Sequence, residues 1–317
     1  FSLHRTVPDY GAPQRQLEVQ KIRGLDFSGG FHDFVIRSGG LEVFPRFSGL
    51  GGGPRQPGDT SVVSSGSPEL DAMFGGGLNR GSVCMVMGTA GAGKSTLTSL
   101  YVSSIADRGE LGVVYCFDES RRTYLQRAHG LELGIYEQVE DGRVELREYS
   151  VGDLTPGQFM QDLRDDVEGR GARLVVIDSF TGLLNLMPGQ SMLVPKLHEA
   201  LRFLSSRNVL SLITLNVHGT LGEFGPDAPT SYLADALVLV RHFEAFGAIR
   251  RCLSVIKRRH GRHENAIREL EIGPGGIRLG RPLTEFTGLL TGTPRFHGRP
   301  ETLLDRERGE PDAGGGG

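Results

Sequence analysis

The chain has 317 residues, of which 38% are hydrophobic and 23% charged, so a collagen-like or wholly disordered protein is excluded. Its formal net charge of -3 gives no general attraction to nucleic acid or to anionic membranes, and nucleic acid is an unlikely partner. Because apolar runs such as 209–215 are shorter than the roughly 18 residues of a membrane helix and no signal-peptide pattern opens the chain, we expect no membrane association and a cytoplasmic location.

The beginning of the chain resembles a later part of the same chain. Residues 15–23 and 251–259 share the pattern R-x-L-x-V-x-K-x-R; after a short gap, residues 32–37 resemble 263–268, and residues 39–41 resemble 275–277. Such self-similarity indicates a repeated structural unit. We predict that residues 1–47 are the closing β-strands of a first domain copy, that residues 63–297 form a complete second copy, and that the natural protein is longer at its N-terminus.

Two segments have the composition of connections rather than of packed structure. Residues 48–62 are rich in Gly and Pro, which is typical of a flexible linker between the two copies. Residues 298–317 are rich in Arg, Glu, Asp and Pro and end in four glycines, so we expect a disordered tail.

Strand and helix patterns alternate through the first part of the second copy. Short apolar runs rich in β-branched residues predict buried strands at 83–87, 112–117, 174–177 and 209–215, and stripes of apolar residues predict helices around 159–167 and 193–204. From residue 236 the pattern changes to successive strands at 236–241, 249–256, 266–271 and 277–279. We therefore predict an α/β fold, a mostly parallel sheet flanked by helices with antiparallel β-hairpins added at its C-terminal edge.

A complete phosphate-binding motif follows the first predicted strand. The pattern G-x-x-x-x-G-K-[ST] is formed by Gly88, Thr89, Ala90, Gly91, Ala92, Gly93, Lys94 and Ser95, and Thr96 continues into the predicted helix. Backbone N–H groups of such a loop surround phosphate oxygens, the helix N-terminus attracts negative charge, and the lysine adds a positive charge at the β- and γ-phosphates. The hydroxyl of Ser95 is a candidate ligand for Mg²⁺.

Acidic residues close two later strands. Asp178 ends the run Leu-Val-Val-Ile and is the candidate second magnesium ligand, unless it is only a solvated residue at the end of a strand. Asp118 and Glu119 follow another strand and are candidates to orient the attacking group and accept its proton, although acidic residues also cap helices and Ser120 is placed to do so. Asn216 and His218 close the strand after these and are candidate γ-phosphate sensors or turn residues.

With these motifs in order, residues 63–297 resemble the KaiC-like branch of the RecA-type P-loop ATPases. The resemblance rests on five segments: 69–81, the phosphate loop, 117–120, 176–179, and the group 231–235, 257–259, 267–269 and 273–276. It covers the whole predicted second domain. The repeat at the start of the chain matches the tandem arrangement of the family.

The resemblance implies a ring, typically a homo-hexamer, that binds and hydrolyses ATP with Mg²⁺ at its subunit interfaces. Lys257 and Arg259 then match positions that reach the γ-phosphate of the neighbouring subunit. Clock-type members phosphorylate an adjacent Ser-Thr pair, for which this chain has Ser231 and Tyr232, so Ser231 is a single candidate phosphoacceptor. The resemblance also implies a signalling or timing role with protein partners, and general-base duty for Asp118 with Glu119 second.

Two other functions compete with this interpretation. Several Arg and Lys residues between 250 and 262 would suit a RecA/RadA-like DNA-dependent ATPase, although the net charge and the absence of an aromatic and basic surface disfavour it. A nucleotide-gated scaffold, whose ring assembles on ATP and presents its acidic tail to a partner, would need little turnover.

Overall fold

The computed structural model describes residues 1–7, 13–45, 61–149, 154–187, 193–217, 233–290 and 293–298. Ser231 and His218 lie outside the described residues, as do nearly all of the predicted linker and the predicted tail from residue 299 onward.

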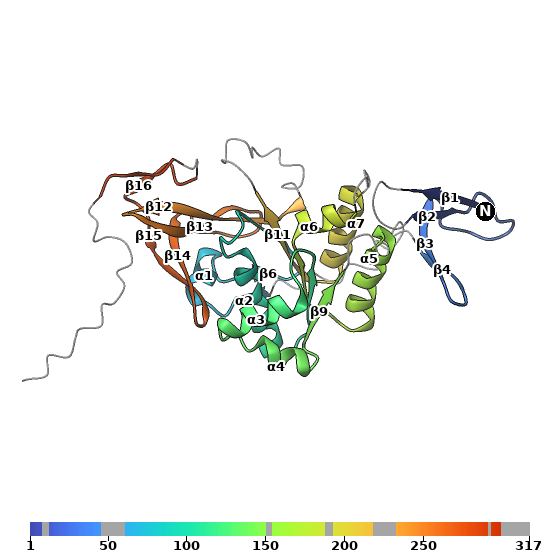
Figure 1. Cartoon of the computed structure of the whole chain (residues 1–317), viewed down its shortest axis with the longest axis horizontal. Coiled ribbons are helices and arrows are strands. Elements are labelled where there is room, and N and C mark those ends of the chain that lie inside the picture. The colour runs from blue at the N-terminus through green and yellow to red at the C-terminus, as the bar shows by residue number, and fades with distance from the viewer. Residues whose placement is uncertain are drawn as a thin grey trace, which may run out of the picture.

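A nine-stranded sheet runs through the middle of the molecule in the order β15-β14-β13-β12-β7-β11-β10-β8-β9 (Figure 1). Six strands are parallel: β7 (Val83–Gly88), β8 (Gly112–Cys116), β9 (Val144–Glu148), β10 (Leu174–Asp178), β11 (Leu210–Asn216) and β12 (Ala236–Ala245). The antiparallel strands β13 (Ala248–Arg258), β14 (Ile267–Gly273) and β15 (Gly276–Pro282) extend one edge. The predicted fold class is confirmed, with the difference that β12 pairs in parallel with β7 before the hairpins begin.

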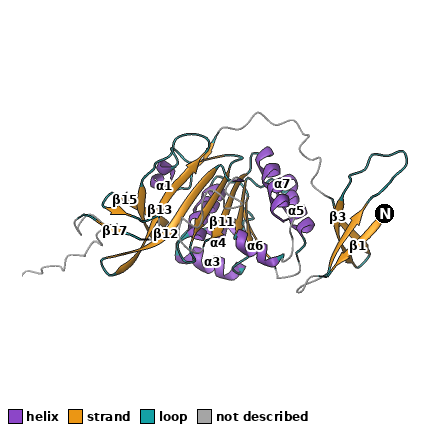
Figure 2. Ribbon diagram, turned by 90° about the horizontal axis from the view of Figure 1, so that it is seen from above, coloured by secondary structure: helices purple, strands orange, loops and turns teal. Residues whose placement is uncertain are grey.

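Helices cover both faces of this sheet (Figure 2). One face carries α2 (Lys94–Asp107), α3 (Arg121–Gly130) and α4 (Ile135–Glu140); the other carries α5 (Pro156–Arg164), α6 (Phe180–Leu186) and α7 (Leu193–Ser206). The helix predicted around 159–167 changes into the π-helical segment η2 (Asp165–Gly169) at its end. Shorter elements are β5 (Val62–Val63), α1 (Pro68–Met73), β6 (Leu78–Asn79), β16 (Phe286–Thr287) and β17 (Arg295–Phe296). Among the described residues, no helix has the length and apolar character needed to cross a bilayer.

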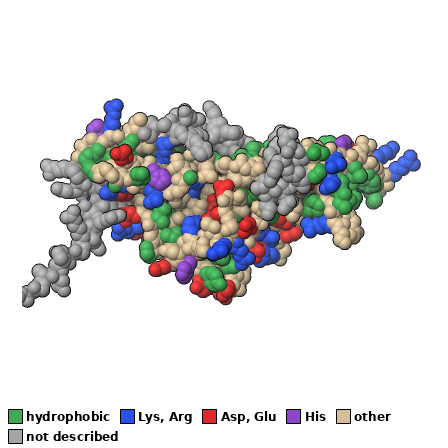
Figure 3. Space-filling model, viewed as in Figure 1, with side chains coloured by type: hydrophobic (Ala, Val, Ile, Leu, Met, Phe, Trp, Pro, Cys, Tyr) green, Lys and Arg blue, Asp and Glu red, His purple; other side chains and the backbone are tan. Residues whose placement is uncertain are grey.

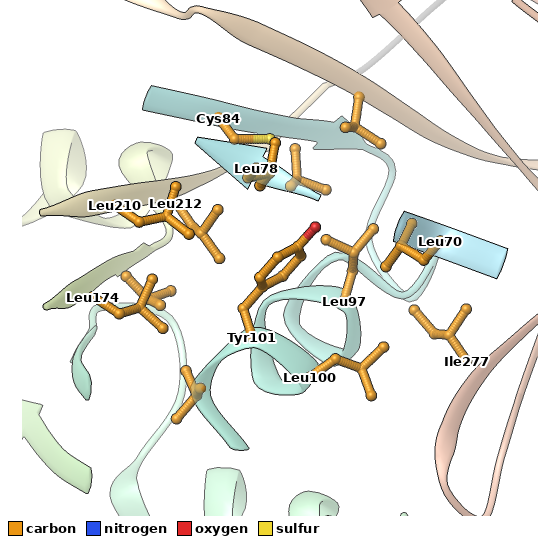
Figure 4. Close-up of a cluster of buried hydrophobic side chains, with 14 of the residues drawn as sticks. Leu70, Leu78, Cys84, Leu97, Leu100, Tyr101, Leu174, Leu210, Leu212 and Ile277 are labelled. Carbon is orange, nitrogen blue, oxygen red and sulfur yellow. The ribbon is translucent and has the colours of Figure 1, made fainter. Parts of the chain in front are cut away.

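The buried strands supply side chains to cores on both faces of the sheet, because successive side chains of a strand point to opposite faces. In β10, Leu174 and Val176 join the core under α2, whereas Val175 and Ile177 join the core under α5 and α7. Figure 4 shows the first of these cores around Tyr101, whose ring from α2 is fully buried beside Leu97 and Leu212. The two cores fix the sheet between its helices, so the ends of its strands are held in place.

The beginning of the chain forms a separate four-stranded meander, which lies beside α5 and α7 in both views (Figures 1 and 2). Its strands are β1 (Ser2–Thr6), β2 (Gln14–Glu18), β3 (Phe31–Arg37) and β4 (Gly40–Phe44). Leu17 lies opposite His32 in the meander, and Leu253 lies opposite Arg268 in the large sheet. Each residue of the second pair is 236 positions after its counterpart in the first (253 − 17 and 268 − 32). The meander thus has the strand order of β12–β15 and, through β2–β4, the register of β13–β15, and the alignment of His32 with His263 across a gap is wrong.

Candidate functional site

The phosphate loop connects the end of β7 with the start of α2. Gly91 and Gly93 have φ angles of 73° and 110°, a left-handed backbone conformation that residues with a Cβ rarely adopt. Lys94 is 6% exposed, and its Nζ donates to the backbone oxygen of Thr89 at 2.8 Å. Burial lowers the pKa of Lys94, while the negative charges of Asp178 and Asp118 act in the opposite direction. The loop therefore has the geometry of an anion-binding loop, with the Lys94 ammonium group held against it by the hydrogen bond to Thr89.

Asp178 ends β10 in the middle of the parallel sheet and is 5% exposed. Its Oδ1 accepts a hydrogen bond from Thr214 Oγ1 of β11 at 2.5 Å, but its Oδ2 is buried and has no hydrogen-bond partner among the described residues. A buried carboxylate oxygen without a partner is unfavourable unless a donor or a cation compensates it. This oxygen and the hydroxyl of Ser95 fit Mg²⁺, which protein sites typically hold with one or two side chains plus phosphate oxygens and water. Within the described ranges there is no cluster of three or more His, Cys, Asp or Glu that could hold a metal alone.

Asp118 follows β8, which neighbours β10 in the sheet. Its Oδ2 accepts hydrogen bonds from Ser179 Oγ, just after β10, and from Asn216 Nδ2 at the end of β11, the latter at 3.2 Å. Ser179 also caps α6, because its Oγ accepts from the backbone N–H of Gly182 at 3.1 Å. A Cβ at Gly182 would overlap Asp118 Oδ1, so a glycine is needed for this approach. Three neighbouring strand ends thereby hold one carboxylate at the same edge of the sheet as Lys94.

Glu119 has a different environment from its neighbour. It forms an ion pair with Arg127 of α3, and burial raises its pKa while the Arg127 charge opposes that shift. The next residue, Ser120, caps α3 as predicted, since its Oγ accepts from the backbone N–H of Thr123 at 3.1 Å. Of the two adjacent acids, Asp118 is the one that meets Ser179 and Asn216.

Lys257 and Arg259 lie far from this chain's own phosphate loop. In β12, Leu237 lies opposite both Lys257 of β13 and Met85, in the middle of β7. The phosphate loop leaves β7 at Gly88, which lies about 10 Å beyond Met85 at about 3.3 Å per residue. Arg259 is farther away, since its backbone N–H donates to Asp235, whose own N–H donates to Val83, about 16 Å from Gly88. Lys257 Nζ donates to the oxygen of Ala234 at 3.0 Å, and Arg259 pairs with Asp235 at 3.3 Å.

Comparison with known proteins agrees with this arrangement. The family model "ATPase: KaiC" matches residues 63–284. The chain belongs to the KaiC family of ATPases. It is 28% identical to circadian clock protein KaiC3 of Synechocystis sp. over 91% of this chain and 57% of that protein. Identity is 24% to the circadian clock oscillator protein KaiC of Synechococcus elongatus, over 92% of this chain and 55% of that protein, so the chain spans about half the length of these relatives.

Membership of an ATPase family implies nucleotide binding. The structure also places residues at the candidate site that the sequence did not reveal. Ser179 lies in the segment 176–179 that resembles the family, but its residue type alone indicates no role. Thr214 and Arg127 lie in none of the motifs. On the outer side of the phosphate loop, His242 Nδ1 lies 3.2 Å from Thr89 Oγ1, and Arg251 Nε donates to the oxygen of Gly91 at 3.3 Å. Only the position of Arg251 in a basic segment could have suggested one of these contacts.

Proposed function

We propose that this domain binds ATP with Mg²⁺ and hydrolyses it, with Asp118 as the general base. The observation that carries the proposal is the convergence of Lys94, Asp178 and Asp118 at one edge of the sheet, with Asp118 held by Ser179 and Asn216. A carboxylate fixed in this way can accept the proton of an attacking water. Ser95 and Asp178 would hold Mg²⁺, which would neutralise charge on the phosphate groups.

We propose that Glu119 is not the base. Its carboxylate forms an ion pair with Arg127. Arg127 belongs to α3, which covers one face of the sheet, and not to the strand ends beside the phosphate loop. Glu119 would have to break this ion pair before it could accept a proton, whereas Asp118 already lies among the strand ends. Glu119 instead secures the start of α3 beside Asp118.

We propose that hydrolysis needs a second copy of the chain. Lys257 lies two strands from β7 and about 10 Å along it from the end that carries the phosphate loop, and Arg259 lies about 16 Å along it. Their side chains contact Ala234 and Asp235 rather than this chain's own phosphate loop. A positive charge can complete the phosphate environment from a neighbouring subunit, as an arginine finger does. A homo-hexameric ring, expected from the family resemblance, would bring these residues to the next site.

We propose that the meander β1–β4 is the end of a preceding domain copy of the same kind. Its strands β2–β4 share the register of β13–β15. The meander exposes Ile36, Leu41 and Leu3, which are 61%, 53% and 63% exposed. The residues at the matching strand positions of β12–β15 behave differently, since Ile277 and Val240 are buried in the core that contains α2 and Ile272 packs partly against it. Val240 matches Leu3 because it lies opposite Leu253 as Leu3 lies opposite Leu17. This face of the meander is therefore suited to packing against a phosphate-loop helix of another domain.

The remaining roles are proposed from the resemblance alone. Autophosphorylation of Ser231 and a signalling or timing function with protein partners are secondary proposals. Against the alternative of a DNA-dependent motor, acidic and basic side chains are intermixed on the face displayed in Figure 3, and they form no continuous basic stripe there. The nucleotide-gated scaffold differs from our proposal in needing no turnover.

Phosphate release by the wild-type chain and by Lys94→Ala tests the proposal. We expect wild type to release phosphate from ATP only with Mg²⁺, and Lys94→Ala to release none. DNA-stimulated release that falls steeply with salt would favour the DNA-dependent motor. ATP-dependent assembly with no release by wild type would favour the scaffold.

A further inference from the structure

A buried carboxylate joins the meander β1–β4 to the ATPase domain. Asp33 of β3 is 6% exposed and accepts three hydrogen bonds: from the backbone N–H of Gly157 at 2.7 Å, from Lys196 Nζ at 3.0 Å and from Gln16 Nε2 at 2.9 Å. A buried charge is tolerated only when it is paired and hydrogen-bonded in this way. Gly157 and Lys196 belong to α5 and α7, so this one side chain links the meander to both helices.

The contact at Gly157 leaves no space for a larger residue. A Cβ added to Gly157 would lie 2.6 Å from Asp33 Cβ, 2.8 Å from its Oδ2 and 3.0 Å from Phe44 Cβ. Gly157 is in the first turn of α5, where Thr155 accepts from the backbone N–H of Gln158 and Asp33 accepts from that of Gly157. The meander therefore completes the hydrogen bonding of the beginning of α5.

The same helix packs against the residue that precedes the proposed base. Phe159, two residues after Gly157, is 2% exposed. Its ring meets Tyr115 at 5.3 Å and Phe117 at 5.9 Å between centroids, in edge-to-face geometry. Tyr149 stacks on Phe117 from another side at 5.7 Å. Because interiors are closely packed, a shift of α5 would displace Phe117 and with it Asp118.

We propose that Asp33 is a positioning residue for hydrolysis: it anchors the meander on the beginning of α5, and α5 holds Asp118 in place through Phe159 and Phe117. The inference rests on the proposed role of Asp118. It goes beyond that role by making the rate of hydrolysis depend on whether the segment before the domain is docked.

The test is Gly157→Ala, with Gly130→Ala as its matched control. Both glycines are helical and neither has a positive φ, but a Cβ at Gly130 would meet nothing within 4 Å. Alanine is favoured over glycine inside helices by up to about 1 kcal/mol, so neither change should unfold the domain. Asp33→Asn is a second variant, which removes the charge while keeping the shape.

Two readouts are needed, namely the kcat and KM for ATP and the hydrogen exchange of residues 31–36 and 113–118. We expect Gly157→Ala and Asp33→Asn to lower kcat three- to tenfold at unchanged KM and to speed exchange in both segments, whereas Gly130→Ala changes neither. The inference would be overturned if hydrogen exchange became faster in residues 31–36 while kcat and the exchange of residues 113–118 stayed unchanged. It would also be overturned if the exchange of residues 31–36 stayed unchanged in Gly157→Ala. If wild type hydrolyses no ATP, the proposed function fails, but exchange at 113–118 still decides whether docking orders the segment before Asp118.

Discussion

Replacement of Asp118 by asparagine distinguishes most clearly which of the two adjacent acids, Asp118 or Glu119, is the general base. Asparagine has the same shape, which matters because the side chain lies against Gly182 without spare room. Its amide oxygen can still accept from Ser179, so we expect a folding cost of about 1 kcal/mol, the typical value of one hydrogen bond. An amide cannot accept the proton of an attacking water, and removing a general base lowers rates about 10²–10⁴-fold. We expect kcat to fall by this factor, equivalent to about 3–5 kcal/mol in the activation barrier.

The same change in Glu119 should act on stability rather than on the rate. Glu119→Gln weakens the ion pair with Arg127, whose Nη1 is already buried with no hydrogen-bond partner in the described part of the chain. We therefore expect a loss of about 1–3 kcal/mol in unfolding free energy. We expect kcat to fall by less than about tenfold, because the Gln side chain still accepts a hydrogen bond from Arg127 and keeps the start of α3 in place.

Steady-state phosphate release at saturating ATP, together with the Kd for ATP of each variant, makes the comparison. The Kd should stay within about threefold of wild type for both variants, because neither residue belongs to the phosphate loop. A larger loss of kcat in Glu119→Gln than in Asp118→Asn, at equal ATP occupancy, would refute our assignment of the base.

Three further predictions follow from the described contacts. Lys94→Ala should abolish detectable ATP binding in equilibrium titration without lowering the melting temperature, because it removes the buried lysine of the phosphate loop; normal binding would contradict the site. Arg259→Ala should bind ATP but hydrolyse it about 10³-fold more slowly, and mixing it with Lys94→Ala should restore release, since each supplies what the other lacks; no recovery in mixed assemblies would contradict action between subunits. Asp166→Asn should lower the unfolding free energy by about 3–5 kcal/mol, or the melting temperature by roughly 6–20 °C. The reason is that Asp166 is fully buried and accepts hydrogen bonds from Arg147 at 2.7 and 2.6 Å and from Tyr115 at 2.6 Å. A decrease in melting temperature of less than about 2 °C would contradict this prediction.

The central strands could be predicted because they are buried on both faces. The apolar runs at 83–87 and 174–177 correspond to β7 and β10 within one residue. In contrast, β9 was not predicted, since Val144–Glu148 lies at the sheet edge and alternates apolar with charged residues over only five positions. The helix α4 was missed for a related reason, because it contributes few buried residues, and the start of α3 was indicated only by its cap, Ser120.

The site could be predicted only where a motif ties residue type to chemistry. Lys94 and Ser95 follow from the phosphate-loop pattern, and Asp178 follows from an acid at the end of a buried strand. The division of roles between Asp118 and Glu119 could not be derived, because it depends on Arg127 and Ser179, which meet these acids only through the fold. The alignment of the internal repeat has the same limit. A local match of His32 with His263 requires a gap, whereas the strand register pairs the two copies without one at this point.

The most direct test of the account follows the γ-phosphate itself. Wild-type protein is incubated with γ-³²P-labelled ATP and Mg²⁺, and label on the protein is separated from free phosphate, with Lys94→Ala, Asp118→Asn and Ser231→Ala in parallel. We predict free phosphate from wild type and Ser231→Ala, none from Lys94→Ala and at least a hundredfold less from Asp118→Asn; any label on the protein should disappear in Ser231→Ala. Free phosphate at the wild-type rate from Asp118→Asn, or from Lys94→Ala, would contradict the proposed site.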